Sequence, residues 1–157
     1  MSSAKGVLDE YWDGMLPVEP GALASQIGLR VIECPDLAQE GISGKFSLEN
    51  SVPTIRYSPA EPRVRQRFTI AHELGHYVLQ HGPSFRDPIA HFNMGYYSPV
   101  EREANRFAAE LLMPAEAVEY LVRTMKDATV AKMASRFDVS QVAMGYRLKN
   151  LGWLNVG

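Results

Sequence analysis

The sequence has a single cysteine, Cys34, and no long hydrophobic run. A lone thiol excludes an intrachain disulfide, and we expect Cys34 to be a small buried apolar residue. No stretch approaches the length needed to span a membrane, and the first residues, MSSAKGVLDEYW, lack the apolar core of a secretory signal. These absences predict a soluble, cytoplasmic protein that does not contact membranes.

A strong net charge is also missing. The net charge of −2 gives no whole-chain reason to expect binding to nucleic acid or to anionic membranes. The charge is uneven, since residues 129–157 carry +3 and the remainder carries −5. With 157 residues, of which 46% are hydrophobic and 22% charged, the chain can bury one core and does not have the composition of a disordered protein.

The segment His72-Glu73-Leu74-Gly75-His76 has the form H-E-x-x-H. On a helix, positions i and i+4 lie on one face about a turn apart, so two imidazoles can bind one tetrahedral metal ion. Glu73, next to the first histidine, can take a proton from a water molecule held at that metal. The motif therefore predicts a zinc metallopeptidase with Glu73 as its catalytic base.

Such histidines can also lie at the wet surface of an ordinary helix. The flanking sequence favours the metal site, because apolar residues recur at helical spacing and predict a partly buried helix. These residues are Phe68, Ile70, Ala71, Leu74, Val78 and Leu79. A buried His-Glu-His set is unfavourable unless a metal or hydrogen bonds satisfy it.

The rest of the pattern predicts an α+β fold, with a small three-stranded antiparallel sheet packed with zincin-type helices. Short strands separated by tight turns favour antiparallel pairing. We predict helices at 7–16 and 21–27 with Gly28 as a stop, strands at 29–32, 41–46 and 53–57, the metal helix from Pro62 to about Gln80, and a loop over the site at 84–97. An edge strand at 53–57 could bind an extended peptide substrate; the alternative is that it only closes the core.

A second helix is expected from Ser98-Pro99 to Pro114, followed by another at 115–125.

The metal needs a third protein ligand, and the candidates are Glu101, Glu103, His81 and His91. Glu101 lies on the face of its helix that becomes apolar toward the core, whereas Glu103 lies on a face suited to solvated ion pairs. A capping box between Ser98 and Glu101 is the competing interpretation. We prefer Glu101 as the ligand and Asn105, one turn on, as the acceptor that orients a histidine ligand.

These motifs together resemble the ImmA/IrrE family of metallo-endopeptidases. The resemblance covers about residues 17–114 and rests on the H-E-x-x-H motif with Arg67-Phe68-Thr69-Ile70-Ala71 before it, on Glu101-Arg102-Glu103-Ala104-Asn105-Arg106-Phe107-Ala108-Ala109, and on Leu111-Leu112-Met113-Pro114. The two motifs are far more specific together than H-E-x-x-H alone.

The resemblance implies a gluzincin-like Zn²⁺ site with His72, His76 and Glu101 as ligands, Glu73 as general base and Asn105 in support. It also implies a protein substrate. Members of the family act in bacteria and in mobile elements such as phages by cleaving helix-turn-helix (XRE-like) repressors, often encoded nearby, and this releases stress or excision genes.

Peptide cleavage also needs a second electrophile beside the metal to stabilise the oxyanion. The sequence offers His91, Tyr96 and Tyr97 in the segment before Ser98. The sequence does not rank them, and each has the alternative role of a packing or surface residue.

The C-terminal part, residues 127–157, is expected to form a helix-turn-helix-like segment that packs on a peptidase domain of residues 1–126. Thr129 to Leu151 predicts two short helices around Asp138-Val139-Ser140. Two departures weaken a DNA-binding role: Asp138 takes the turn position where glycine is usual, and Arg147 stands where an apolar residue is expected. We therefore favour packing on the peptidase or binding of a partner protein over DNA contact.

Two rival functions remain at this stage. One is a DNA-binding regulator whose metal site is structural, and the other is a non-catalytic partner such as one half of a toxin–antitoxin pair. A structural zinc site normally has four protein ligands, whereas three ligands and a water suit catalysis. The number of side chains at the metal therefore discriminates between these functions.

Overall fold

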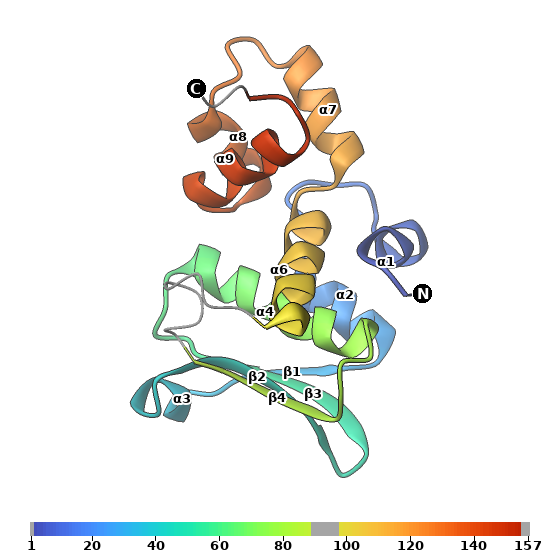
Figure 1. Ribbon diagram of the computed structural model, residues 1–157, viewed down its shortest axis with the longest axis vertical. Coiled ribbons are helices and arrows are strands. Elements are labelled where there is room, and N and C mark those ends of the chain that lie inside the picture. Colours follow the sequence, from blue (N-terminus) through green and yellow to red (C-terminus); the bar gives the residue numbers. More distant parts are fainter. Residues whose placement is uncertain (1, 89–97, 155–157) are drawn as a thin grey trace.

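The structure is a computed structural model that describes residues 2–88 and 98–154 (Figure 1). A sheet lies at one end of the molecule, α4 and α6 lie next to it, and the C-terminal helices lie at the other end. In chain order the elements are α1 (Ala4–Tyr11), α2 (Pro20–Ile27), β1 (Arg30–Glu33), α3 (Asp36–Gln39), β2 (Ile42–Glu49), β3 (Val52–Tyr57), α4 (Arg63–Val78), β4 (Ser84–Pro88), α6 (Pro99–Leu112), α7 (Ala115–Thr124), α8 (Val130–Phe137) and α9 (Gln141–Asn150). The α+β class predicted from the sequence is confirmed.

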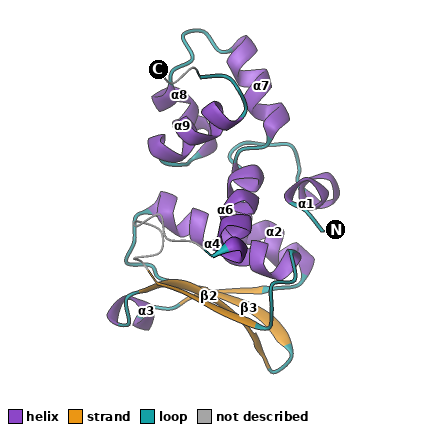
Figure 2. Ribbon diagram, viewed as in Figure 1, coloured by secondary structure: helices purple, strands orange, loops and turns teal. Residues whose placement is uncertain are grey.

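The sheet differs from the predicted three-stranded antiparallel one. It is a four-stranded mixed sheet in the order β1-β3-β2-β4, and Figure 2 shows its strands grouped on one side of the helices. β1 pairs parallel to β3, with Arg30 opposite Thr54, whereas β2 pairs antiparallel with both β3 and β4. The prediction failed because β1 and β2 are consecutive strands but are not neighbours in the sheet. The chain passes through α3 after β1 and forms β2 one strand position away. β3 then fills the position between them and runs parallel to β1.

The predicted edge strand at 53–57 is also wrong, because β3 lies inside the sheet between β1 and β2. The outer positions belong to β1 and β4. β4 falls in the segment predicted as a loop, where no apolar alternation indicates a strand. Phe46 of β2 pairs with both Ile55 of β3 and Phe85 of β4, so the strand is specified by its partner.

Two glycines let α4 approach its neighbours closely. A Cβ atom on Gly44 of β2 would collide with the methyl group of Thr69 and would lie 3.3 Å from Oε2 of Glu73. A Cβ atom on Gly75 of α4 would lie 3.0 Å from Cδ1 of Phe107 on α6. The helix that carries the H-E-x-x-H motif is therefore held tightly between β2 and α6.

The helix ends follow the sequence signals well. Ser98 caps α6, since its Oγ accepts a hydrogen bond from the Glu101 amide at 3.3 Å, and Pro99 takes the first position. Gly28 ends α2 in the left-handed conformation, with φ of 118°. The first helix, α1, is shorter than the predicted helix at 7–16 and begins earlier in the chain. It begins after its cap Ser3 and ends before Trp12. The indole Nε1 of Trp12 donates to the Met15 carbonyl.

The C-terminal helices, α8 and α9, pack on the rest of the chain. Their buried residues belong to the same hydrophobic cluster as those of α4 and α6. Arg67 of α4 donates from Nε to the Asp138 carbonyl at 3.0 Å, and Arg147 of α9 donates from Nε to the Met113 carbonyl at 3.0 Å. Asp138 occupies the turn in the left-handed conformation, with φ of 55°. The proposed domain boundary at residue 126 stays a prediction.

Within residues 2–88 and 98–154, no helix has the length and hydrophobicity that crossing a bilayer requires.

Candidate metal centre

Three side chains from two helices converge at the face where α4 meets α6. His72 and His76 come from α4 and Glu101 comes from α6, and their ligand atoms all lie within 4.8 Å of one another. Nε2 of His72 lies 3.0 Å from Oε2 of Glu101, and Nε2 of His76 lies 3.0 Å from Oε1 of the same carboxylate. The helical spacing of the histidines and the cap at Ser98 together produce this convergence.

The chemistry of these donors fits a zinc-type divalent cation. Zn²⁺ prefers imidazole nitrogen and carboxylate oxygen in a four-coordinate site. The donors are shielded from solvent, with relative exposures of 1% for His72, 0% for His76 and 9% for Glu101. Among the residues that the structure describes, no fourth histidine, cysteine or carboxylate joins the group. Three protein ligands leave one coordination position for water or substrate, as in catalytic sites.

Asn105 of α6 orients the first histidine. Its Oδ1 lies 2.8 Å from Nδ1 of His72. Because an amide oxygen can only accept, the imidazole donates from Nδ1, and the lone pair of Nε2 is left for the metal. The structure places Asn105 next to His72, and its predicted role in support of a metal ligand stays a prediction.

The second histidine is held by a chain of two further residues. Nδ1 of His76 lies 2.9 Å from Nδ1 of His81, and Nε2 of His81 lies 3.0 Å from Oε2 of Glu103. When His81 donates from Nε2 to the carboxylate, its Nδ1 can accept from His76, whose Nε2 lone pair would then be available to a metal. His81 and Glu103, considered from the sequence as ligands, lie behind the site.

The backbone after α4 explains where His81 lies. Gln80 adopts φ of 58°, which turns the chain back at the end of the helix. The His81 amide then donates to the His76 carbonyl at 3.0 Å. The imidazole therefore returns to the side of the residue that it contacts, although it follows the end of the helix.

Phe85 of β4 is a residue of the site that the sequence analysis missed. Its ring stacks on the imidazole of His76, with centroids 3.9 Å apart and planes at 3°. The contact places the outer strand of the sheet beside the metal centre. No periodicity around residue 85 indicates it, because the strand is defined by pairing with β2.

Glu73 is fully buried on α4, with an exposure of 0%, and faces β2 near Gly44. It directly follows His72 in sequence but is not one of the three converging residues. Its role as base stays a prediction. The three proposed oxyanion donors, His91, Tyr96 and Tyr97, lie outside the described residues.

Comparison with protein-family models identifies a family for this chain. A family model for the IrrE N-terminal-like domain, Peptidase_M78, matches residues 24–149, which include His72, His76 and Glu101, all of α8 and nearly all of α9. No curated protein matches the chain. Since the model covers most of the sequence and agrees with the ImmA/IrrE resemblance of its motifs, the chain belongs to the Peptidase_M78 family, a family of metallopeptidase type.

Proposed function

We propose that this protein is a zinc-dependent endopeptidase that hydrolyses a peptide bond in a bacterial or phage repressor of the helix-turn-helix (XRE-like) class. The observation that carries the proposal is the convergence of His72, His76 and Glu101 within 4.8 Å, in a chain of the Peptidase_M78 family. Three protein donors at one buried point suit a catalytic metal better than a structural one.

The residues around this point divide the work of hydrolysis. Zn²⁺ held by His72, His76 and Glu101 would acidify a water molecule and polarise the scissile carbonyl. Glu73 takes the proton of the attacking water and delivers it to the leaving amine. Asn105 and His81 hold the two imidazoles in the tautomer that keeps Nε2 unprotonated.

The outer strand β4 offers a place for the substrate backbone. β2 pairs with one side of β4, and no strand of the described residues pairs with its other side. Phe85 of the same strand stacks on His76, so a peptide added along β4 would pass the metal centre. β4 thus takes the place of the strand at 53–57, for which the sequence leaves open both peptide binding and closure of the core.

The test is the substitution Glu73→Gln, which keeps the size of the side chain and removes its basicity. We expect the variant to bind zinc as the wild type does and to lose cleavage of the repressor encoded beside its gene. Bound metal is measured by mass spectrometry of the purified protein, and cleavage by gel electrophoresis. Cleavage by the variant at the wild-type rate would falsify the mechanism.

DNA binding through the C-terminal helices is the second candidate. Arg147 of α9 is half-buried and donates to the Met113 carbonyl, which weighs against a contact with DNA phosphates. A mobility shift that weakens steeply with salt, without any cleavage of the repressor, would favour the regulator over the peptidase.

A further inference from the structure

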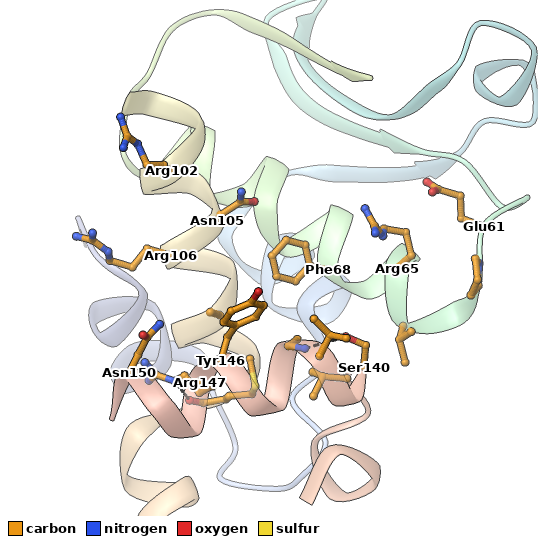
Figure 3. Close-up of a pocket in the computed structure, with 17 residues that line it drawn as sticks. Glu61, Arg65, Phe68, Arg102, Asn105, Arg106, Ser140, Tyr146, Arg147 and Asn150 are labelled. Atoms are coloured by element: carbon orange, nitrogen blue, oxygen red, sulfur yellow. Dashed lines mark hydrogen bonds between the residues drawn. The ribbon is translucent and has the colours of Figure 1, made fainter. Parts of the chain in front are cut away.

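A cavity of about 640 Å³ lies between α4, α6 and α9 and is not used by the metal chemistry described above (Figure 3). Its volume is within the range of ligand-binding pockets. Figure 3 shows Phe68 of α4 and Tyr146 of α9 directed into the space between the three helices. The cavity therefore separates the helix of the H-E-x-x-H motif from the last helix of the chain.

The lining carries an excess of positive charge. Arg65, Arg102, Arg106 and Arg147 line the cavity, and Glu61 is the one carboxylate among the residues that line it. Arg102 and Arg106 are exposed, and no residue in the described part of the chain forms an ion pair with either side chain. The lining is thus complementary to a ligand with acidic groups.

Arg147 adds to the positive charge of the lining, and its Nε is already bonded to the Met113 carbonyl. Its side chain is half-buried at the base of the cavity, and this burial lowers the pKa of its guanidinium. Glu110 opposes that effect without lining the cavity. The cations of the lining that have room for an acidic ligand are therefore the exposed Arg102 and Arg106.

The same lining exposes apolar side chains. Val142 and Tyr146 lie one turn apart on α9, with exposures of 69% and 64%, and both line the cavity. Val64 and Phe68 of α4 line the opposite side. An exposed apolar surface rimmed by charged residues is typical of a protein-binding site.

Asn105 connects the cavity to the metal centre. It lines the cavity, and its Oδ1 holds Nδ1 of His72 at 2.8 Å. A ligand in the cavity therefore contacts the residue that orients a metal ligand. A substrate whose scissile bond lies at the metal can reach the cavity with the chain that flanks this bond.

We infer that this cavity binds a segment of the protein substrate that carries acidic side chains beside apolar ones and that flanks the bond to be cleaved. The inference rests on the proposed peptidase function, which it extends to substrate recognition. The acidic side chains pair with Arg102 and Arg106, and the apolar side chains pack on Phe68, Val142 and Tyr146.

Binding can be measured without cleavage, in the Glu73→Gln protein loaded with zinc. The probe is a fluorescent helical peptide of Leu, Ala and Glu with one apolar face. The control peptide has the same sequence with Lys in place of Glu. We expect anisotropy to show binding of the Glu peptide only. The double substitution Arg102→Glu/Arg106→Glu should raise its Kd about tenfold or more, and Tyr146→Ala should raise it by a similar factor.

The control is Arg123→Glu/Lys126→Glu, which changes the net charge equally at exposed positions outside the cavity. It should leave the Kd within about twofold of the parent, because distant exposed charges are screened. Circular dichroism establishes that all variants are folded. Failure of the Glu peptide to bind, equal binding of the Lys peptide, or equal losses in the control and cavity variants would overturn the inference.

A labelled DNA duplex tests the other macromolecule that a basic surface attracts. The inference is wrong, and the surface is a nucleic-acid site, if three results occur together: the duplex binds, the cavity variants bind the duplex more weakly, and the Glu peptide does not bind.

Cleavage kinetics provide a further test, with the cognate repressor as substrate and Glu73 intact. The cavity variants should raise KM about tenfold and leave kcat within about twofold. If the wild type and all variants fail to cleave the repressor while the Glu peptide still binds, the result counts against the peptidase function alone.

Discussion

Nδ1 of His76 lies 2.9 Å from Nδ1 of His81, on the side of the imidazole that faces away from Glu101. Two ring nitrogens can form a hydrogen bond only when one carries the proton and the other does not. Glu103 decides which, because its carboxylate accepts from Nε2 of His81. A carboxylate on α6 thus sets the tautomer of His76, a proposed metal ligand on α4, through an intervening histidine.

We predict that His81→Ala lowers zinc affinity about 10- to 100-fold, as losses of residues behind metal ligands do. His76 would lose the partner that fixes its tautomer and ring orientation. The measurement is competition with a chromophoric zinc chelator. His81→Asn, which keeps an acceptor, should recover part of the affinity, and a wild-type affinity in His81→Ala would show that the contact does not orient the ligand.

A second prediction concerns Gly44, where β2 meets α4. In Gly44→Ala the new methyl group collides with the methyl group of Thr69 and lies 3.3 Å from the Glu73 carboxylate. We expect the free energy of unfolding to fall by about 1–3 kcal/mol, since the interface has no space for the methyl group. Thermal or urea denaturation measures this.

The matched control is Gly145→Ala in α9, where an added Cβ meets nothing within 4 Å. Alanine has the higher helix propensity, so this variant should be more stable by about 0.5–1 kcal/mol. If both substitutions had the same effect, the close approach of α4 to the sheet would not be the cause.

A third prediction concerns Arg67, which ties the C-terminal helices to the N-terminal part of the chain. Its side chain is 7% exposed, and Nη2 donates to the carbonyls of Val18 at 2.6 Å and Phe137 at 3.3 Å. Burial lowers the pKa of its guanidinium, with the Asp138 and Glu19 carboxylates acting in the opposite direction. Arg67→Met should lower the free energy of unfolding by about 3 kcal/mol, because the carbonyls lose their donors.

Arg63 supplies the comparison for this measurement. It also pairs with Asp138, at 2.7 Å, but its side chain is 71% exposed. Arg63→Ala should change the free energy of unfolding far less than Arg67→Met does, as exposed ion pairs contribute little. Hydrogen exchange should speed up in α8 and α9 of Arg67→Met only. Equal exchange in both variants would mean that Arg67 does not hold these helices.

Much of the metal centre could be predicted because its determinants are local. The H-E-x-x-H spacing places His72 and His76 on one face of a helix whatever surrounds it. Ser98 and Pro99 fix the first turn of α6, which sets the face that carries Glu101 and Asn105. The capping interpretation of Glu101 was half right, since its amide bonds Ser98 while its carboxylate faces the histidines.

The missed features depend on contacts between distant segments. β4 has no alternating pattern of its own and is a strand because β2 pairs with it, so Phe85 could not be assigned to the site. The parallel pairing of β1 with β3 depends on the path through α3, which strand propensity does not encode. Arg147 occupies a position where a helix-turn-helix usually has an apolar residue. In this protein it donates to the backbone carbonyl of Met113, and no pattern of side chains in the sequence predicts that contact.

The last prediction concerns the pH dependence of stability at the β2–β3 turn. Glu49 accepts two hydrogen bonds from Arg56, both of 2.8 Å. These bonds lower the pKa of Glu49 from 4.5 to about 2. The folded protein therefore binds this proton less tightly than the unfolded chain, so the stabilisation is complete above pH 4.5 and is lost as the pH falls toward 2.

Glu49→Gln should accordingly lower the free energy of unfolding at neutral pH by about 1–2 kcal/mol, a value that allows for solvent screening of this partly exposed pair. Urea denaturation of both proteins across the acid range measures the difference, and the subtraction removes the titration of the other carboxylates. We expect the two stabilities to converge as the pH approaches 2, since the wild-type side chain then becomes neutral as well. A difference that stayed constant with pH would show that Glu49 contributes by its shape and hydrogen bonds to Arg56, and its charge would then have no part in the stability.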